Sequence, residues 1–139
     1  MSHDESAPPF DPAGTVLCIE DQPISMDVVE AMLGTYPRIR LVKAFTGGEG
    51  VRLVERERPD LVLLDMNLPD MSGLEVVRAL SVQISTHGLR VVLLTSDSFS
   101  IDVVKAMSFG AHEYWPKPLT LERAASGLRR VLGEGAARP

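Results

Sequence analysis

The sequence predicts an α/β fold in which five parallel strands form one doubly wound sheet with helices on both faces, a three-layer sandwich. Short runs of leucine or β-branched residues alternate along the chain with longer segments of helical period. Two of the short runs, at 61–64 and 91–94, are apolar at every position. Continuous apolar runs are typical of strands that are covered on both faces of a parallel sheet. Because a helix separates each strand from the next, the strands are expected to pair in parallel through right-handed crossovers.

The strands are expected at residues 15–19, 40–45, 60–64, 90–94 and 111–115. The third and fourth are expected at the centre of the sheet, because they contain the two continuous apolar runs. Pro116 follows the last strand and lacks a backbone donor, so that strand is expected at an edge.

One helix is expected between successive strands and one after the last. Pro23 suits the first turn of the first helix, while 46–49 and 72–75 fit the capping-box pattern at the starts of the second and third. Ser100 and Thr120 are expected to cap the fourth and fifth helices. Apolar residues at helical spacing are expected to face the core: Val28, Met32 and Leu33 in the first helix; Ile101, Val104 and Phe109 in the fourth; Leu121, Ala125, Leu128 and Leu132 in the fifth.

The 139 residues suit one domain, expected at 14–132, with a disordered leader at 1–13 and a short tail at 133–139. The counts of 14 Lys and Arg against 19 Asp and Glu give a net charge of −5, which argues against direct binding of nucleic acid. No apolar run approaches the roughly 18 residues that cross a bilayer, so membrane insertion is not expected. The absence of a signal-peptide pattern and the single Cys18 predict a cytoplasmic location.

Polar side chains follow four of the predicted strands: Glu20 and Asp21, Asp65, Thr95 and Lys117. In a doubly wound sheet such residues meet at the carboxyl ends of the strands. Two carboxylates about 4 Å apart repel by roughly 4 kcal/mol at an effective dielectric near 20. A pair that shares a proton would relieve this repulsion, but a divalent cation with oxygen ligands, such as Mg²⁺, relieves three nearby acids more directly. A carboxylate beside Mg²⁺, together with a hydroxyl and an ammonium group, suits phosphoryl transfer, with Asp65 as the nucleophile.

Four stretches carry a family resemblance: IED at 19–21, LLDMNLPDMSG at 63–73, LTS at 94–96 and GAHEYWPKP at 110–118. Over residues 15–132 the chain resembles the receiver domain of two-component response regulators. It is most similar to chemotaxis-regulator-like receivers and to the receivers of hybrid kinases. The resemblance implies the flavodoxin-like strand order 2-1-3-4-5.

The resemblance also implies a role for each site residue. Asp65 corresponds to the phosphoacceptor, which takes a phosphoryl group from a histidine kinase or a histidine phosphotransfer domain. Asp21 and Asp65 are implied as ligands of Mg²⁺, or of Mn²⁺ in its place, with Glu20 acting mostly through water. The backbone carbonyl of Asn67 is the implied third protein ligand.

Thr95 resembles the switch hydroxyl, Tyr114 the switch aromatic residue and Lys117 the cation that contacts the phosphoryl group. A cis Lys117–Pro118 bond is implied as well. Charge added to Asp65 is expected to attract Thr95 and Lys117 and so to alter the surface formed by the fourth helix, the fifth strand and the fifth helix. An unknown downstream protein, or a second copy in a homodimer, is the expected partner of this surface. Such a domain is not an enzyme in the usual sense, since it catalyses only its own aspartyl phosphorylation and dephosphorylation.

Other positions carry finer expectations. Asn67 and Asp97 correspond to positions along the path of attacking water, which suggests a modest to short phosphate lifetime. Ile24 and Met26 are candidate partner contacts, and Trp115 is expected to be a partly exposed contact.

Three other functions fit less well. A haloacid-dehalogenase-like phosphatase needs Asp-x-Asp after its first strand, whereas here residues 65–67 follow the third strand and lack the second acid. A flavin-binding module needs a loop that accepts phosphate after the first strand, where Glu20 and Asp21 repel it. A receiver-like interaction module that is never phosphorylated remains an alternative, disfavoured because all the required groups are present.

Overall fold

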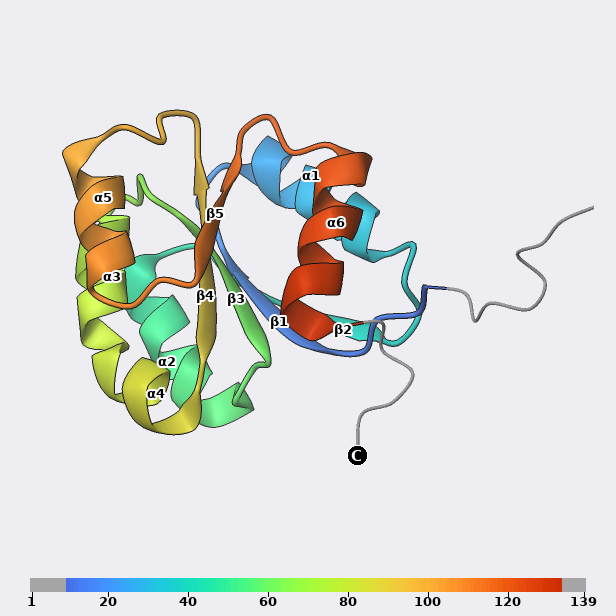
Figure 1. The fold of residues 1–139 in the computed structure, drawn as a ribbon, viewed down its shortest axis with the longest axis horizontal. Helices are drawn as coiled ribbons and strands as arrows, with labels where there is room; N and C mark the ends of the chain where they lie inside the picture. The colour runs from blue at the N-terminus through green and yellow to red at the C-terminus, as the bar shows by residue number, and fades with distance from the viewer. Residues whose placement is uncertain (1–9, 134–139) are drawn as a thin grey trace, which may run out of the picture.

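A computed structural model describes residues 10–133. Within them, five parallel strands form one sheet in the order β2-β1-β3-β4-β5, the predicted order (Figure 1). The strands are β1 (Gly14–Ile19), β2 (Ile39–Ala44), β3 (Leu61–Asp65), β4 (Arg90–Thr95) and β5 (Glu113–Pro116). The helices are α1 (Pro23–Leu33), α2 (Gly47–Glu57), α3 (Gly73–Ala79), α4 (Ser81–His87), α5 (Ile101–Ser108) and α6 (Leu121–Leu132).

The sheet separates two hydrophobic layers. Helices α1 and α6 cover one face and α2 to α5 the other, as Figure 1 shows. Side chains alternate along β1, so that Leu17 and Ile19 pack beneath α2 while Val16 and Cys18 pack beneath α1 and α6. Strand β3 is buried at every position, as the apolar run predicts, and β5 lies at the expected edge.

Two helices, not one, connect β3 to β4. They meet at Leu80, where ψ is 11° and the backbone N–H contacts the carbonyl oxygens of both Val76 and Val77. Neither glycine nor proline marks this break in the sequence. The fourth and fifth helices expected from the sequence are therefore α5 and α6.

The predicted caps are confirmed, but several helix faces differ from expectation. The hydroxyl groups of Thr46, Ser72, Ser100 and Thr120 each accept a hydrogen bond from a backbone N–H in the first turn of their helix. The buried residues, however, are Met26, Val29 and Leu33 in α1; Val103 and Ala106 in α5; and Ala124, Gly127, Leu128, Val131 and Leu132 in α6. Several residues expected in the core are instead exposed: Val28, Ile101, Val104, Phe109 and Leu121.

Part of the segment expected as a disordered leader packs against the domain. The ring of Phe10 contacts that of Tyr36 edge-on at 5.4 Å, and the guanidinium of Arg129 lies 4.3 Å from its centroid. Asp11 pairs with Arg38 at 3.3 Å. Residues 1–9 of the expected leader and 134–139 of the expected tail lie outside the described part of the chain. None of the helices within residues 10–133 is long and apolar enough to span a bilayer.

Candidate functional site

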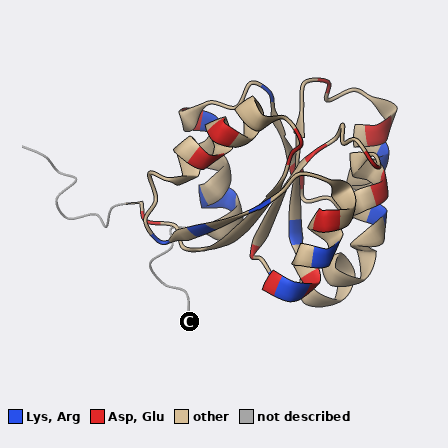
Figure 2. Ribbon diagram, turned by 180° about the vertical axis from the view of Figure 1, so that it is seen from behind, with Lys and Arg blue, Asp and Glu red and all other residues tan. Residues whose placement is uncertain are grey.

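Three carboxylates meet where β1 and β3 end. Ile19 lies opposite Leu64 in the parallel register, so the residues that follow them, Glu20 and Asp65, emerge side by side. One oxygen from each of Glu20, Asp21 and Asp65 lies within 4.8 Å of the others. Figure 2 shows acidic positions converging at the carboxyl ends of the central strands. Glu20 is fully buried and Asp65 is 4% exposed.

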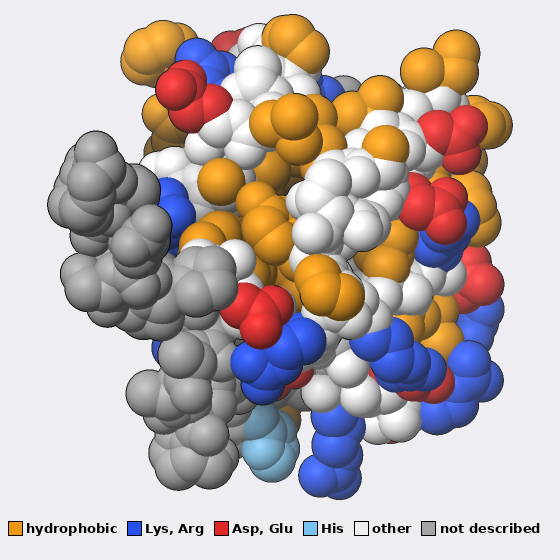
Figure 3. All heavy atoms as spheres, turned by 90° about the vertical axis from the view of Figure 1, so that its right-hand side faces the viewer, with side chains coloured by type: hydrophobic (Ala, Val, Ile, Leu, Met, Phe, Trp, Pro, Cys, Tyr) orange, Lys and Arg blue, Asp and Glu red, His pale blue; other side chains and the backbone are white. Residues whose placement is uncertain are grey.

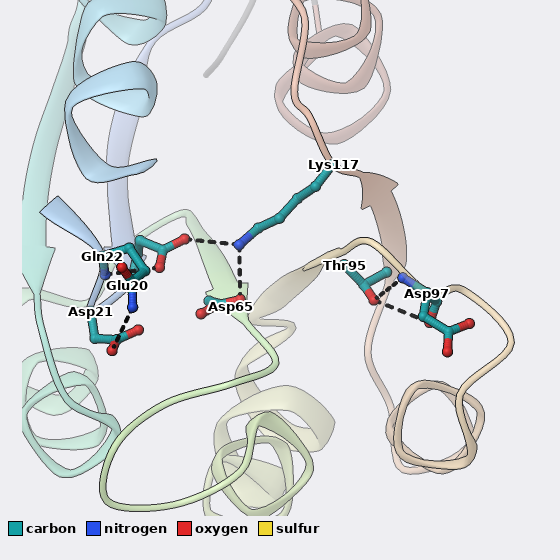
Figure 4. Close-up of polar contacts among 7 residues, drawn as sticks. All are labelled: Glu20, Asp21, Gln22, Asp65, Thr95, Asp97 and Lys117. Atoms are coloured by element: carbon teal, nitrogen blue, oxygen red, sulfur yellow. Dashed lines mark hydrogen bonds and ion pairs between the residues drawn. The ribbon is translucent and has the colours of Figure 1, made fainter. Parts of the chain in front are cut away.

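Lys117 reaches this cluster from the loop after β5 (Figure 4). Its Nζ donates to Glu20 Oε1 at 3.1 Å and to Asp65 Oδ1 at 3.0 Å. The backbone N–H of Lys117 donates to the carbonyl oxygen of Thr95 at 2.8 Å, which ties the loop to the end of β4. The Lys117–Pro118 bond is cis, as the resemblance implies.

Burial and neighbouring charges shift the pKa values of Glu20, Lys117 and Cys18. Burial raises the pKa of the Glu20 carboxyl, and the negative charge of Asp65 adds to the effect. Burial also lowers the pKa of Lys117, but its hydrogen bonds and charge contacts with Asp65 and Glu20 outweigh burial and raise the pKa above its ordinary value. Burial, followed by the charges of Glu20 and Asp65, raises the pKa of the Cys18 thiol to about 12, so that Cys18 remains a protonated core residue.

The donor set fits a divalent cation. One ammonium group stands against three carboxylates, and Asp21 Oδ1 is buried without a hydrogen-bond partner among the described residues. Glu20 Oε2 accepts the backbone N–H of Gln22 at 3.1 Å, which orients this carboxylate. Hard oxygen ligands in this number suit Mg²⁺, which usually takes one or two carboxylates together with water.

The loop between β3 and α3 folds back on itself beside the cluster. Asn67 and Ser72 form an isolated antiparallel bridge, and the N–H of Gly73 donates to the carbonyl of Met66 at 3.0 Å. A side chain at Gly73 has no room, since a Cβ there would lie 2.8 Å from Met66 Cα. At the tip of the loop, Asp70 contacts the first turn of α2.

Thr95 lies at the end of β4 with its hydroxyl group turned to its own loop. The hydroxyl donates to the carbonyl of Asp97 at 3.1 Å and accepts the N–H of Asp97 at 3.0 Å (Figure 4). Tyr114 lies on β5 opposite Leu93 and is 42% exposed.

The model of the response regulator receiver domain matches residues 16–129. The chain belongs to this family. Receiver domains act in two-component signalling. PilH of Pseudomonas aeruginosa is 32% identical to this receiver over 117 residues, which are 84% of the chain and 96% of PilH. The probable transcriptional regulatory protein TcrX of Mycobacterium tuberculosis is 35% identical over 118 residues, which are 85% of the chain and 49% of TcrX. The receiver thus spans about half the length of TcrX.

Solved receiver structures share the fold. The receiver domain of the sensor histidine kinase PA1611 from P. aeruginosa, with a magnesium ion coordinated in its active-site cleft, matches with a TM-score of 0.78 and 28% identity. That match covers 87% of this chain and 98% of the PA1611 domain. The chemotaxis protein CheY4 of Vibrio cholerae matches with a TM-score of 0.78 and 25% identity, covering 86% of this chain and 99% of CheY4.

The receiver brings Glu20, Asp21, Asp65 and Lys117 together, as expected from the strand ends. Thr95 and Tyr114 point elsewhere in this conformation, and Asn67 is exposed in its loop.

Two expectations near the site are corrected, and one residue is new. Trp115 is only 2% exposed, because its ring packs on Gly127 of α6 and its indole N–H donates to Glu113. Met26 is buried in the core, whereas Ile24 is 79% exposed. Asp70 lies within the 63–73 stretch, but no role was expected for it; in the structure its carboxylate holds the loop beside the cluster to α2.

Proposed function

We propose that this receiver accepts a phosphoryl group on Asp65, with Mg²⁺, from a histidine kinase or a histidine phosphotransfer domain. The observation that supports this most directly is the cluster of three carboxylates contacted by one lysine, in which Asp21 Oδ1 is buried without a partner. Membership of the receiver family and the magnesium-bound PA1611 domain support the same conclusion.

Each residue has a defined task in the proposed reaction. A carboxylate oxygen of Asp65 attacks the phosphorus of a phosphohistidine; the new O–P bond forms as the P–N bond breaks and its electron pair stays on the imidazole nitrogen. Lys117 already donates to Asp65 and would pair with an incoming phosphoryl oxygen. Asp21, Asp65 and the carbonyl of Asn67 would hold the ion, with Glu20 acting through water. When bound, Mg²⁺, or Mn²⁺ in its place, neutralises charge on the phosphoryl oxygens.

An apolar cleft beside the site supports docking of the phosphodonor. The cleft has a volume of about 470 Å³ and lies between α1 and the loop before α6, with Glu20 and Lys117 in its wall. Its other lining includes Ile24, Val28 and Leu119. Figure 3 shows hydrophobic side chains gathered on this side of the molecule. We assign the cleft to the helical surface that presents the phosphohistidine, with Ile24 as a contact.

The proposed output begins with Thr95. Its hydroxyl donates to the carbonyl of Asp97, so donation to a phosphoryl group on Asp65 requires that this hydrogen bond break. The loop after β4 would then shift and leave space into which Tyr114 turns, changing the surface of α5, β5 and α6. This surface would bind a downstream protein or a second copy in a homodimer. Asp97 and Asn67 would line the path of attacking water and shorten the phosphate lifetime.

The proposed reaction also indicates the role of the domain, its location and the class of its partners. A domain that catalyses only its own phosphorylation and dephosphorylation acts as a signalling switch, and its donors place it in the cytoplasm. Its outputs are proteins and not nucleic acid, in keeping with the net charge of −5.

Labelling with a small phosphodonor tests the central assignment. With acetyl phosphate and Mg²⁺, the wild type should gain one phosphoryl group by intact-mass spectrometry, and chelation of Mg²⁺ should prevent the gain. Asp65→Asn should remove the labelling, whereas Asp102→Asn, an exposed substitution in the first turn of α5, should label like the wild type. Equal labelling of the Asp65→Asn protein would refute Asp65 as the acceptor.

A further inference from the structure

We propose that Asp70 is a positioning residue for the Asp65 site: its carboxylate fixes the β3–α3 loop to the amino end of α2. The inference rests on the proposed function, because the loop supplies the Asn67 carbonyl that would contact the ion. Asp70 itself touches neither Asp65 nor Lys117 among the contacts of the described residues.

The carboxylate of Asp70 accepts two backbone N–H groups that a helix cannot satisfy internally. Oδ1 accepts from Gly47 at 2.8 Å and Oδ2 from Gly48 at 2.9 Å. The two bonds use both oxygens and hold the side chain in one orientation. The favourable field at the helix start suits an anion there, and hydrogen bonds from Gly48 and then Gly47 lower the pKa of Asp70. The carboxylate is therefore charged at neutral pH.

Met71, the residue after Asp70, packs against the same first turn of α2. A Cβ on Gly47 would lie 2.7 Å from the sulfur of Met71 and overlap its Cγ, so the loop tip seats directly on the glycine backbone. A carboxylate and a thioether side chain thus hold consecutive loop residues, Asp70 and Met71, on the same helix turn.

The loop is fixed at its base, to which Asn67 belongs, and at its tip. Its base is closed by the Gly73 to Met66 hydrogen bond at 3.0 Å and by the bridge between Asn67 and Ser72. Its tip is held by Asp70. Without the tip contact, residues 68–71 would move more freely and the bridge at the base would open more often, so that the Asn67 carbonyl would sample directions away from the carboxylate cluster.

If Asp70 served only as a cap of α2, its removal should have the same effects as removal of another cap of that helix. Helix α2 has a capping arrangement of its own, in which Thr46 Oγ1 accepts the N–H of Glu49 at 3.1 Å and Glu49 Oε1 accepts the N–H of Phe45 at 2.9 Å. Thr46 caps the same helix end without touching the β3–α3 loop in any described contact. Thr46→Ala is therefore the matched control for loss of a cap.

The experiment compares Asp70→Ala, Asp70→Asn and Thr46→Ala in the full chain. Hydrogen exchange is measured without metal, Mg²⁺ affinity by calorimetry, and the rate of labelling by acetyl phosphate at saturating Mg²⁺. Asp70→Ala should speed exchange in residues 66–73 and weaken Mg²⁺ binding by about tenfold, the effect typical of residues that orient metal ligands. Asp70→Asn, which keeps one acceptor oxygen and the fold, should fall between. Thr46→Ala should speed exchange in α2 but leave the loop and the Mg²⁺ affinity within about twofold of wild type.

The outcomes separate this inference from the function on which it rests. If the wild type binds Mg²⁺ and is labelled, but Asp70→Ala and Thr46→Ala behave alike in loop exchange and affinity, Asp70 is only a cap and the inference is overturned. If the wild type neither binds Mg²⁺ nor is labelled, the proposed function fails and the inference with it.

Discussion

At the scale of single residues, the proposed role of Glu20 at the site conflicts with its contribution to stability. Its carboxylate is fully buried beside Asp65, and burial is the main cause of its raised pKa. A carboxyl group whose pKa rises on folding binds its proton more tightly in the native state than in the unfolded state. The contribution of Glu20 to stability therefore falls as the pH rises from its unfolded pKa through its folded pKa. Lys117 offsets part of this loss through its hydrogen bond at 3.1 Å.

Glu20→Gln should therefore stabilise the metal-free protein at neutral pH. The amide keeps the shape of the side chain and removes the buried charge, and we expect a gain on the order of 1 kcal/mol in the free energy of unfolding at pH 7.5. The gain should vanish below about pH 4, the ordinary pKa of glutamate, where the wild-type carboxyl is protonated in both states. Urea unfolding of both proteins across this pH range measures the difference.

Glu113→Gln provides a control of the opposite sign. Burial pushes the pKa of Glu113 upward, but hydrogen bonds from Arg130 and Trp115 outweigh it and lower the pKa. The native state is then stabilised above the unfolded pKa, and the stability is lost as the pH falls through the folded pKa. Glu113→Gln should destabilise at pH 7.5. A Glu20→Gln protein that is less stable than wild type at that pH would contradict the account of Glu20.

At the scale of elements, α6 is held against β5 by the fit between Gly127 and Trp115. The indole occupies the space that a side chain at 127 would need, since a Cβ there would lie 2.7 Å from Trp115 Nε1 and overlap the ring carbons. Alanine favours a helix over glycine by about 1 kcal/mol, whereas overpacking a core costs up to about 3 kcal/mol. The overlap with a rigid ring places the cost at the upper end, so Gly127→Ala should destabilise by about 2 kcal/mol.

Chemical unfolding followed by the fluorescence of Trp115, the single tryptophan, measures this change. Ser126→Ala, at the exposed neighbouring position in α6, should change stability by less than about 0.5 kcal/mol. A Gly127→Ala protein as stable as wild type would mean that α6 shifts freely on β5.

The helix faces also show which features of the fold can be predicted from the sequence and which cannot. Strands and caps depend on local chemistry, so the apolar run of β3 and the cap at Thr46 are predictable from neighbouring residues. In α5, by contrast, the exposed pair Ile101 and Val104 and the buried pair Val103 and Ala106 share the same spacing of three. Periodicity alone cannot choose between two such pairs. Ile101 and Val104 are the larger pair, so they were expected in the core, but they lie on the exposed face.

The residues of the candidate site that follow strands could be predicted from the sequence, but the contact of Asp70 could not. Glu20, Asp21, Asp65 and Lys117 follow strands, and the rule that parallel strands end at one edge is enough to bring them together. The contact between Asp70 and Gly47 joins the β3–α3 loop to the start of α2, 23 residues earlier in the chain. It depends on how α2 sits on the sheet, a tertiary relation that no local pattern encodes.

At the scale of the whole molecule, the wrongly assigned face of α5 becomes a surface feature. Phe99 is 91% exposed, Ile101 70% and Val104 58%, and Figure 1 shows α5 on the opposite side of β5 from α6. Tyr114 of β5 and Leu121 of α6 extend the series of exposed apolar residues. Exposed apolar residues on these three elements favour an interaction surface, since contiguous apolar patches mark such surfaces. Tyr114, the proposed switch residue, is one of these exposed residues, so we expect phosphorylation to change the association of this surface.

Val104→Glu tests whether this surface pairs two copies of the receiver. In a two-fold interface the residue meets the same patch of the other copy, so the substitution adds two carboxylates to one contact. With acetyl phosphate and Mg²⁺, wild-type protein should form dimers in sedimentation experiments, and Val104→Glu should weaken dimerisation by at least about tenfold. Because Val104 is exposed, stability should change by less than about 0.5 kcal/mol. Val82→Glu, at a residue 62% exposed on α4, controls for added charge and should dimerise like wild type. If Val104→Glu dimerises as well as wild type, the copies pair elsewhere and the apolar face of α5 serves a different protein.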